Sequence, residues 1–282
     1  MKNVFGYPYV KDGELRCDGE RFVTERVDAG FKQELDKAVG EVVESENKSS
    51  LPKPLKVLRT VCVLIVAMIV LALIKSLRKN SIEAMFGNSP MIFYVGGACL
   101  VVWLVLTVLE KSYYKKVEAS GEFNRIAGKI ENLKKQSEEM LGVPPESKAV
   151  DVLSFRYTEK NGKVKIKEDL FYKHSNNEMK LYRDKDNLCL ADIECVYSFP
   201  IADIKRYVLK KKKAEMDEWN KDTPFDKDEY KQYKIAANDY GTIFCKYYAL
   251  QFSDVFGEYE IFFPVYELEA FKAIADAPVE NE

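Results

Sequence analysis

The sequence predicts an α+β membrane protein that combines a two-helix transmembrane hairpin, a helical stalk and an antiparallel β-barrel or sandwich capped by a C-terminal helix. Two long apolar runs, residues 60–74 and 91–109, lie close together in the first part of the 282-residue chain. A stripe of apolar residues at helical spacing follows the second run. Alternating apolar and polar segments, separated by turn residues, then continue to a final amphipathic segment.

The two apolar runs are long enough to cross a bilayer. Residues 91–109 carry no charge, and a hydrocarbon core of about 30 Å requires about 20 such residues. Residues 60–74 form a shorter run, but Arg59 and Lys75 at its ends can extend to the headgroups. We therefore expect a transmembrane hairpin over residues 51–111, with spans at about 58–77 and 91–110.

Neither run contains an Asp, Glu, Lys, Arg or His side chain. Ion and proton pathways through membranes usually depend on such groups, so the sequence argues against a channel or a transporter. The small residues Gly96, Gly97 and Ala98 offer a flat surface for close helix contact. We expect this surface to pack on the first span near Ala67 or Ala72, with self-association of hairpins as the alternative.

Basic residues flank both spans and predict the orientation of the chain. By the positive-inside rule, their distribution favours a multi-pass protein of the cell membrane with both termini in the cytoplasm. Basic residues in the connecting loop weaken this bias. The flanking residues are Lys48, Lys53, Lys56 and Arg59, then Lys111, Lys115, Lys116 and Arg125, and the loop residues are Lys75, Arg78 and Lys79.

Two segments outside the spans are predicted to form a stalk. Residues 1–50 read as a hairpin at 14–25 and an amphipathic helix at 30–46, and residues 112–142 as a longer stalk helix. We expect the two helices to pack as an antiparallel, coiled-coil-like pair, since neither apolar stripe is stable alone. A parallel stalk between two copies is the alternative. The stripes are Phe31, Leu35, Ala38, Val39, Val42 and Val43, and Phe123, Ile126, Ile130, Leu133, Ser137 and Met140.

Residues 149–282 are expected to form one β-domain. About seven strand-like segments occur there, and the basic run 210–213 reads as part of a turn or helix. A long charged stretch, residues 214–230, separates two sets of strands. The chain then continues into a helix with an apolar face made of Tyr266, Leu268, Phe271 and Ile274.

The segments SFPIADIKRY and IFFPVYELEAFKAI, together with this order of elements, resemble a pleckstrin-homology-like (PH-like) domain. The whole layout is similar to uncharacterised bacterial membrane proteins that join a two-span hairpin to a C-terminal cytoplasmic PH-like domain. The acidic stretch 214–230 is longer than a simple PH-like connection requires. The resemblance implies a binding or scaffolding module rather than an enzyme, although a fold alone does not determine function.

Motifs for catalysis, metals and cofactors are absent from the sequence. Six cysteines are scattered without a CxxC pair, which excludes a zinc ribbon or a disulfide framework. His174 is the single histidine, so histidine dyads are unavailable. The acidic residues Asp222, Asp226, Asp228 and Glu229 miss the calcium-loop pattern. We therefore expect no catalytic residue, no metal and no cofactor, and the near-neutral net charge of −2 argues against nucleic acid as a partner.

Two groups of residues are candidates for binding. Lys163, Lys165 and Lys167 alternate with apolar residues, so their ammonium groups share one strand face that could bind an anionic lipid headgroup; an ordinary solvated face is the simpler interpretation. Trp219 and Phe225 stand within a polar stretch. They either pack back onto the domain or form a docking point for a partner.

The sequence therefore favours a non-enzymatic, membrane-anchored scaffold or interaction protein. It would hold an unknown protein partner, or copies of itself, at the membrane. Recognition of an anionic lipid headgroup or a small ligand by the β-domain is the alternative. A third hypothesis is an unrecognised enzyme that uses carboxylates.

Overall fold

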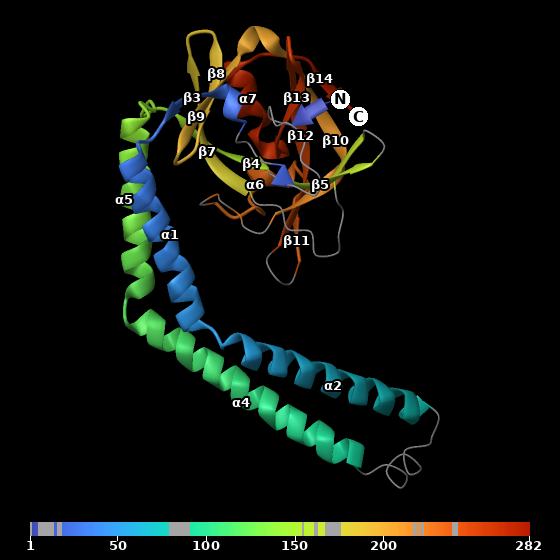
Figure 1. The fold of residues 1–282 in the computed structure, drawn as a ribbon. Coiled ribbons are helices and arrows are strands. Elements are labelled where there is room, and N and C mark those ends of the chain that lie inside the picture. Colours follow the sequence, from blue (N-terminus) through green and yellow to red (C-terminus); the bar gives the residue numbers. More distant parts are fainter. Residues whose placement is uncertain are drawn as a thin grey trace. The chain divides into compact units, whose positions relative to one another are not determined.

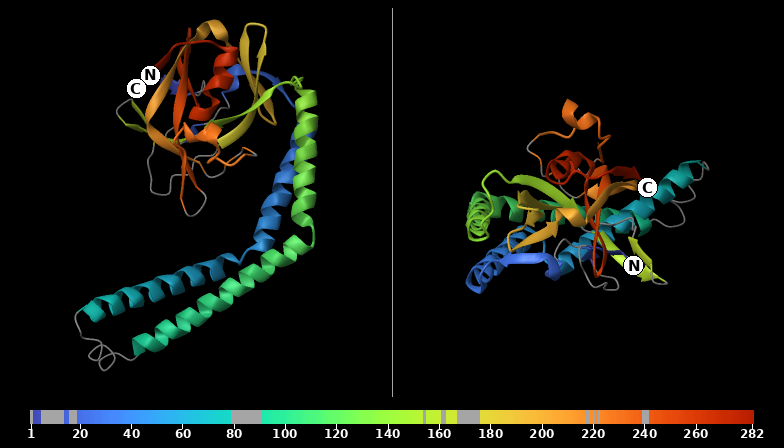
Figure 2. Two further views of the ribbon diagram at one scale, coloured as in Figure 1. Left: turned by 180° about the vertical axis from the view of Figure 1, so that it is seen from behind. Right: turned by 90° about the horizontal axis from the view of Figure 1, so that it is seen from above.

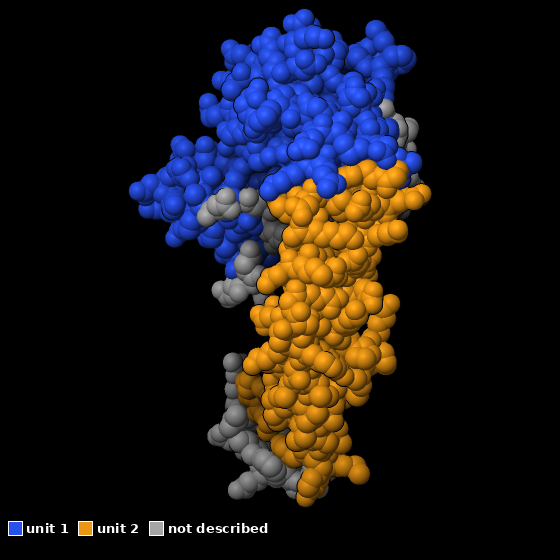
Figure 3. Space-filling model, turned by 90° about the vertical axis from the view of Figure 1, so that its left-hand side faces the viewer, with its two compact units in different colours: residues 1–29, 134–282 blue, residues 30–133 orange. Residues whose placement is uncertain are grey.

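The computed structural model describes residues 2–4, 14–15, 19–78, 91–153, 155–160, 163–166, 176–216, 219, 221, 223–238 and 242–282. The chain is α+β. It has a helical N-terminal region, two apolar helices and a large mixed β-sheet. It divides into two compact units, coloured separately in Figure 3. We call residues 30–133 the helical unit, and residues 1–29 together with 134–282 the β-unit.

Long helices make up the helical unit. In Figures 1 and 2, α1 lies beside α5 and α2 lies beside α4. Pro52 precedes α2 and Pro54 is its second residue, where a missing backbone N–H costs no helical hydrogen bond. Gly121, with φ of +72°, separates α4 from α5. The bounds are α1 Ala29–Ser49, α2 Lys53–Arg78, α4 Met91–Ala119 and α5 Glu122–Met140.

Ion pairs show that α1 and α5 run antiparallel, as predicted. Lys129 lies 2.8 Å and Arg125 3.0 Å from the carboxylate of Glu41, whereas Lys48 lies 3.3 Å from Glu122. Later residues of α1 thus face earlier residues of α5. Two of these links share Glu41, which fixes the register of the pair more firmly than one exposed pair would.

The buried stripe of α1 differs from the predicted one. Phe31, Leu35 and Ala38 are buried, but Val39 and Val43 are each 51% exposed. The spacing of four and three residues continues instead to Ser45, which is buried. The prediction was wrong at the two valines because a stripe along a helix keeps to that spacing and not to adjacent apolar residues. On α5, Ile126, Leu133 and Ser137 are buried and Met140 is exposed.

The β-unit contains an 11-stranded sheet and a 3-stranded sheet among the described residues. The large sheet has the order β14-β10-β12-β13-β4-β7-β8-β9-β3, with β1 added to β13 and β11 to β12. It is mixed, because β1 lies parallel to β13 and β14 lies parallel to β10, whereas the sequence predicted a wholly antiparallel arrangement. These parallel pairings join segments far apart in the chain, which local patterns do not reveal.

The core of the β-unit lies between the large sheet and helix α7 (Figure 1). Phe271 of α7 is fully buried and stacks on Phe263 of β13, with ring centroids 4.1 Å apart and planes 10° apart. Tyr266 is also buried, and Leu268 and Ile274 pack partly against the core. The predicted apolar face of the final helix is confirmed.

Other predictions for this region need correction. The expected hairpin at 14–25 does not form, because β2 pairs with β5 and β3 pairs with β9. The basic run 210–213 lies in strand β10 and not in a helix. Strand β10 pairs with β12 up to Leu209 and again from Lys213, and this pairing on both sides of an irregularity overrides the helix propensity of lysine. The predicted strand 150–157 spans two strands, β4 and β5.

The remaining bounds are as follows. The strands are β1 Lys2–Val4, β2 Glu14–Leu15, β3 Val23–Arg26, β4 Lys148–Leu153, β5 Phe155–Lys160, β6 Lys163–Ile166, β7 Asn176–Asp184, β8 Asn187–Ala191, β9 Cys195–Pro200, β10 Ile204–Met216, β11 Ala236–Ala237, β12 Ile243–Asp254, β13 Gly257–Pro264 and β14 Val279–Asn281. The short helices are the 3-10 turns Glu20–Phe22, Ile201–Asp203 and Val265–Glu267, with α6 Asp228–Lys231 and α7 Leu268–Ile274.

Candidate functional site

Helices α2 and α4 direct large apolar side chains outward. Met68 is 62%, Leu71 65% and Val108 66% exposed, although all three belong to the most apolar segments of the chain. Both helices are long and apolar enough to cross a membrane. Burying such a side chain stabilises a protein by about 1.5–3 kcal/mol, so this surface is costly in water and calls for an apolar environment.

Charged and aromatic residues gather at one end of this helix pair. Arg59 of α2 forms an ion pair with Glu110 of α4. Tyr113 and Tyr114 follow on α4, and the Tyr114 ring lies 5.7 Å from that of Phe123. Aromatic rings beside charged residues are typical of the interface between lipid and water. The Arg59–Glu110 ion pair also holds the ends of α2 and α4 together.

A close contact joins the two apolar helices near the other end. A Cβ atom at Gly96 would lie 2.7 Å from Cδ1 of Ile69, whereas at Gly97 nothing lies within 4 Å. Gly96 therefore lets α4 approach α2, which confirms the predicted contact for Gly96, although the nearest side chain is that of Ile69 and not of Ala67 or Ala72. Gly97 and Ala98 are exposed, so the rest of the predicted surface is not covered by α2.

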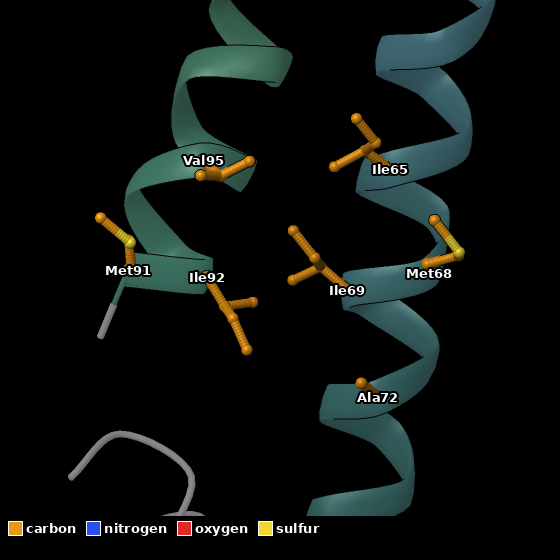
Figure 4. Close-up of a pocket in the computed structure, with 7 residues that line it drawn as sticks. All are labelled: Ile65, Met68, Ile69, Ala72, Met91, Ile92 and Val95. Carbon is orange, nitrogen blue, oxygen red and sulfur yellow. The ribbon is translucent and has the colours of Figure 1, made fainter. Parts of the chain in front are cut away.

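An apolar groove of about 380 Å³ lies between α2 and α4. Figure 4 shows Ile69 and Ile92 extending into it from opposite helices. Only apolar side chains line the groove, so it offers no hydrogen bond or charge to select a polar ligand. Its seven lining residues are Ile65, Met68, Ile69, Ala72, Met91, Ile92 and Val95.

The β-unit buries a cluster of ionisable side chains. Asp151 of β4 and Glu267 are 1% and 2% exposed. The Tyr266 hydroxyl donates to Oδ2 of Asp151 over 2.7 Å, and the backbone N–H of Asp151 donates to Oε1 of Glu267 over 3.0 Å. The ammonium of Lys221 lies 2.6 Å from Glu267. Each carboxylate therefore has donors from this chain, as buried charges require.

Burial dominates the acid–base properties of this cluster. Burial raises the pKa of Glu267 above its ordinary value, although Lys221 opposes the shift. Burial disfavours the charge of Lys221, but attraction to Glu267 raises its pKa overall. Burial also raises the pKa of Tyr266, and the neighbouring Asp151 raises it further. The Lys221–Glu267 ion pair joins the segment around Lys221 to Glu267, and the Asp151–Glu267 hydrogen bond joins Glu267 to strand β4.

Trp219 and Phe225 pack back onto the β-unit. The Trp219 ring contacts those of Tyr266 and Tyr230 edge-on, with centroids 5.1 and 5.0 Å apart. Phe225 lies against Trp219 at 6.4 Å. Both side chains are half-buried on a second apolar cluster around Met216. This arrangement matches the first of the two alternatives, and leaves only part of each ring for a partner.

The other predicted site residues are placed less fully. Lys163 and Lys165 lie on strand β6, which pairs with β5, so they share one side of the strand by their spacing. Lys167 lies outside the described residues, as do His174 and Asp222. The lysine strand therefore stays a prediction of the sequence.

An apolar turn in the β-unit was missed. Val255 and Phe256, between β12 and β13, are 92% and 74% exposed. Asp254 accepts hydrogen bonds from the backbone N–H groups of Phe256 and Gly257, which holds the turn. Arg21 pairs with Asp254 and lies 3.6 Å from the Phe256 ring centre. The unusual pair of large apolar residues between two strands was the available signal, since polar residues normally fill such turns.

The chain shows no match to a protein-family model, to a curated protein or to a solved structure. Its function must therefore be argued from its own residues. Within the described ranges, no group of three or more His, Cys, Asp or Glu side chains is placed to hold a metal ion. The five cysteines that the structure describes are free thiols.

Proposed function

We propose that this protein is a membrane-anchored interaction protein. Helices α2 and α4 span the bilayer, and the β-unit, which we interpret as a PH-like module, holds a protein partner or another copy of the chain on the cytoplasmic side. The observation that carries the proposal is the outward exposure of large apolar side chains along both helices. Contact of this surface with lipid would be favourable in free energy, whereas its contact with water would be unfavourable.

The residues at one end of the two antiparallel helices support a cytoplasmic location for that end. Arg59, Glu110 and the two tyrosines form one interfacial belt at the end where the chain continues to α1 and α5. Lysines at positions 111, 115 and 116 extend that belt. Under the positive-inside rule, this end faces the cytoplasm.

Membrane extraction tests the anchor. The full chain should stay in the membrane pellet after washing at high salt and at alkaline pH, and should be released only by detergent. Release by alkaline washing would contradict two membrane spans. A protease added to sealed vesicles with the cytoplasmic face outward should digest the β-unit, and digestion only after detergent would reverse the orientation.

Crosslinking tests the interaction role. In intact cells, the full chain should be recovered with one stoichiometric protein, either a partner or a second copy. The variant Phe271→Ala, which removes a core ring of the β-unit, should lose that protein at equal membrane level. The variant Leu104→Ala, at an exposed position of α4, should keep it. Equal recovery with both variants would move the interaction to the helices.

A further inference from the structure

Strand β14 covers one edge of the large sheet. It lies parallel to β10, with Tyr207 opposite Val279 and Leu209 opposite Asn281. The backbone N–H of Tyr207 donates to the carbonyl of Pro278 over 2.8 Å, and the N–H of Glu282 donates to the carbonyl of Leu209 over 3.1 Å. Main-chain hydrogen bonds therefore hold β14 in place.

Little packing accompanies those bonds. All three residues of β14 are exposed, and Val279, its one apolar residue, is 44% exposed. The chain just before β14 is anchored differently, because Ala275 is buried and its carbonyl accepts from the Tyr207 hydroxyl at 2.7 Å. Residues 279–282 can thus leave the sheet without opening the core.

Charge complementarity supplies the specificity of this contact. Arg206 lies 2.7 Å from Glu280, and Lys210 lies 3.5 Å from Glu282. The carboxylate of Glu282 also accepts the backbone N–H of Lys211 over 3.2 Å. An acidic strand is thereby paired with a basic one.

The basic edge extends beyond the strand that covers it. Strand β10 runs over Ile204–Met216, but β14 pairs with it only at residues 207–209. Past that point, no other described strand pairs with this side of β10. Lys211, Lys212 and Lys213 are exposed there. The edge is therefore longer than its present occupant, and its pairing with β12 on the other side is irregular between Leu209 and Lys213.

We propose that the β10 edge receives an extended acidic segment of a partner protein by strand addition, and that β14 occupies part of this site within the same chain. Strand addition takes its affinity from main-chain hydrogen bonds and its specificity from side chains at the edge. The inference rests on the proposed function, because it names the class of partner that the β-unit holds. Detachment of residues 279–282 would free the edge for a longer acidic segment.

A peptide competition tests this proposal on the full chain in detergent. The probe is a fluorescent hexapeptide with the sequence of residues 277–282, APVENE. In the variant Glu280→Lys/Glu282→Lys, the chain's own strand loses its charge pairs, so the peptide should bind at least tenfold more tightly than to the unaltered chain. Binding that is no tighter would overturn the proposal.

Two controls identify the site. Asp184→Lys/Asp186→Lys makes the same change in net charge at exposed positions around the β7–β8 turn and should leave peptide binding unchanged. Adding Arg206→Gln to the first variant should weaken binding of APVENE, whereas the peptide APVQNE, which lacks the carboxylate that faces Arg206, should bind equally with and without Arg206→Gln. Tighter binding in the turn control, or no response to Arg206→Gln, would show that net charge and not the β10 edge binds the peptide.

The outcome is independent of the anchor. Failure of peptide binding with normal membrane extraction would reject strand addition and leave the proposed anchoring in place. Loss from the membrane pellet would reject the anchor, whatever the peptide does. If the charge-reversed variant sediments with vesicles of anionic lipid but does not bind the peptide, the exposed lysines serve a lipid surface and the proposal is overturned.

Discussion

The helical unit and the β-unit place the same kinds of side chain in opposite environments. In α2 and α4, leucines, valines and methionines face outward, and a charged pair joins the helix ends. In the β-unit, most of the described large apolar side chains face inward, with exceptions such as Val255 and Phe256. The buried carboxylates of Asp151 and Glu267 are held by Tyr266 and Lys221. Under the proposed anchoring, the difference arises because lipid surrounds α2 and α4 whereas water surrounds the β-unit.

The largest contrast should come from equal apolar truncations in the two units. Phe271→Ala removes a fully buried ring, so the free energy of unfolding of the β-unit should fall by about 3–5 kcal/mol. Leu104→Ala, at a position 47% exposed on α4, should change it by less than about 0.5 kcal/mol. Urea unfolding of the full chain in detergent, followed by near-ultraviolet circular dichroism, measures both. Equal losses of unfolding free energy in the two variants would contradict the contrast between the two units.

A smaller effect is expected from the buried ion pair. Glu267→Gln removes the charge that faces Lys221, and should lower the free energy of unfolding by about 2–3 kcal/mol. Glu269→Gln changes an exposed carboxylate two residues away and should have little effect. Urea unfolding at neutral pH compares the two variants. If they are equally stable, the Lys221–Glu267 pair does not hold the segment to the sheet.

Alkaline pH should destabilise the β-unit. Burial, with a contribution from Asp151, raises the pKa of the Cys245 thiol from 9.0 to about 12. Because the folded chain keeps a proton that the unfolded chain releases, the thiol's contribution is fully present below pH 9 and declines as pH rises towards 12. The slope is about 1.4 kcal/mol per pH unit for one proton.

The variant Cys245→Ala isolates that contribution. Between pH 9 and 11, the free energy of unfolding should fall less steeply with pH in Cys245→Ala than in the unaltered chain, by up to about 1.4 kcal/mol per pH unit. Cys99→Ala on α4 should leave this slope unchanged. Urea titrations at several pH values give both slopes. Identical slopes for Cys245→Ala and the unaltered chain would assign the alkaline sensitivity to other buried groups, such as Tyr207 and Tyr266.

The smallest effect concerns the fit of the two apolar helices. Gly96→Ile should push α4 away from Ile69, whereas Gly97→Ile should be accommodated, since nothing lies within 4 Å of that position. The thiols of Cys62 and Cys99 lie within hydrogen-bonding reach, so mild oxidation should join them. Gly96→Ile should slow this crosslink severalfold, and Gly97→Ile should not. Equal crosslinking rates in the two variants would contradict a close contact between Gly96 and Ile69.

Local patterns predicted the elements whose environment is set by their own residues. The apolar helices, the antiparallel pairing of α1 with α5, and the inward face of Tyr266 and Phe271 all follow from spacing along the chain. Patterns failed where distant pairing decides the outcome. Lysines 210–213 read as part of a turn or helix, but they lie in β10, which pairs on both sides of this run with β12, a strand that begins about 30 residues later.

The candidate sites were predicted less completely, for a related reason. Trp219 and Phe225 were recognised as informative, but Tyr266 and Tyr230, which they contact, come from other parts of the chain. The charge pairs between β10 and β14 join residues more than 70 positions apart. No periodicity encodes such pairs, since they depend on how strands are ordered in the sheet.

The division of the chain has a consequence for biosynthesis. The helical unit is an insertion: β1, β2 and β3 come before it, and their partners β13, β5 and β9 come after it. A ribosome therefore delivers both apolar helices before most of the sheet exists. Under the proposed anchoring, the translocation machinery inserts the hairpin before the strands of residues 1–29 have their partners. The β-unit can fold only after the pairing strands, which lie more than 130 residues later in the chain, have been synthesised.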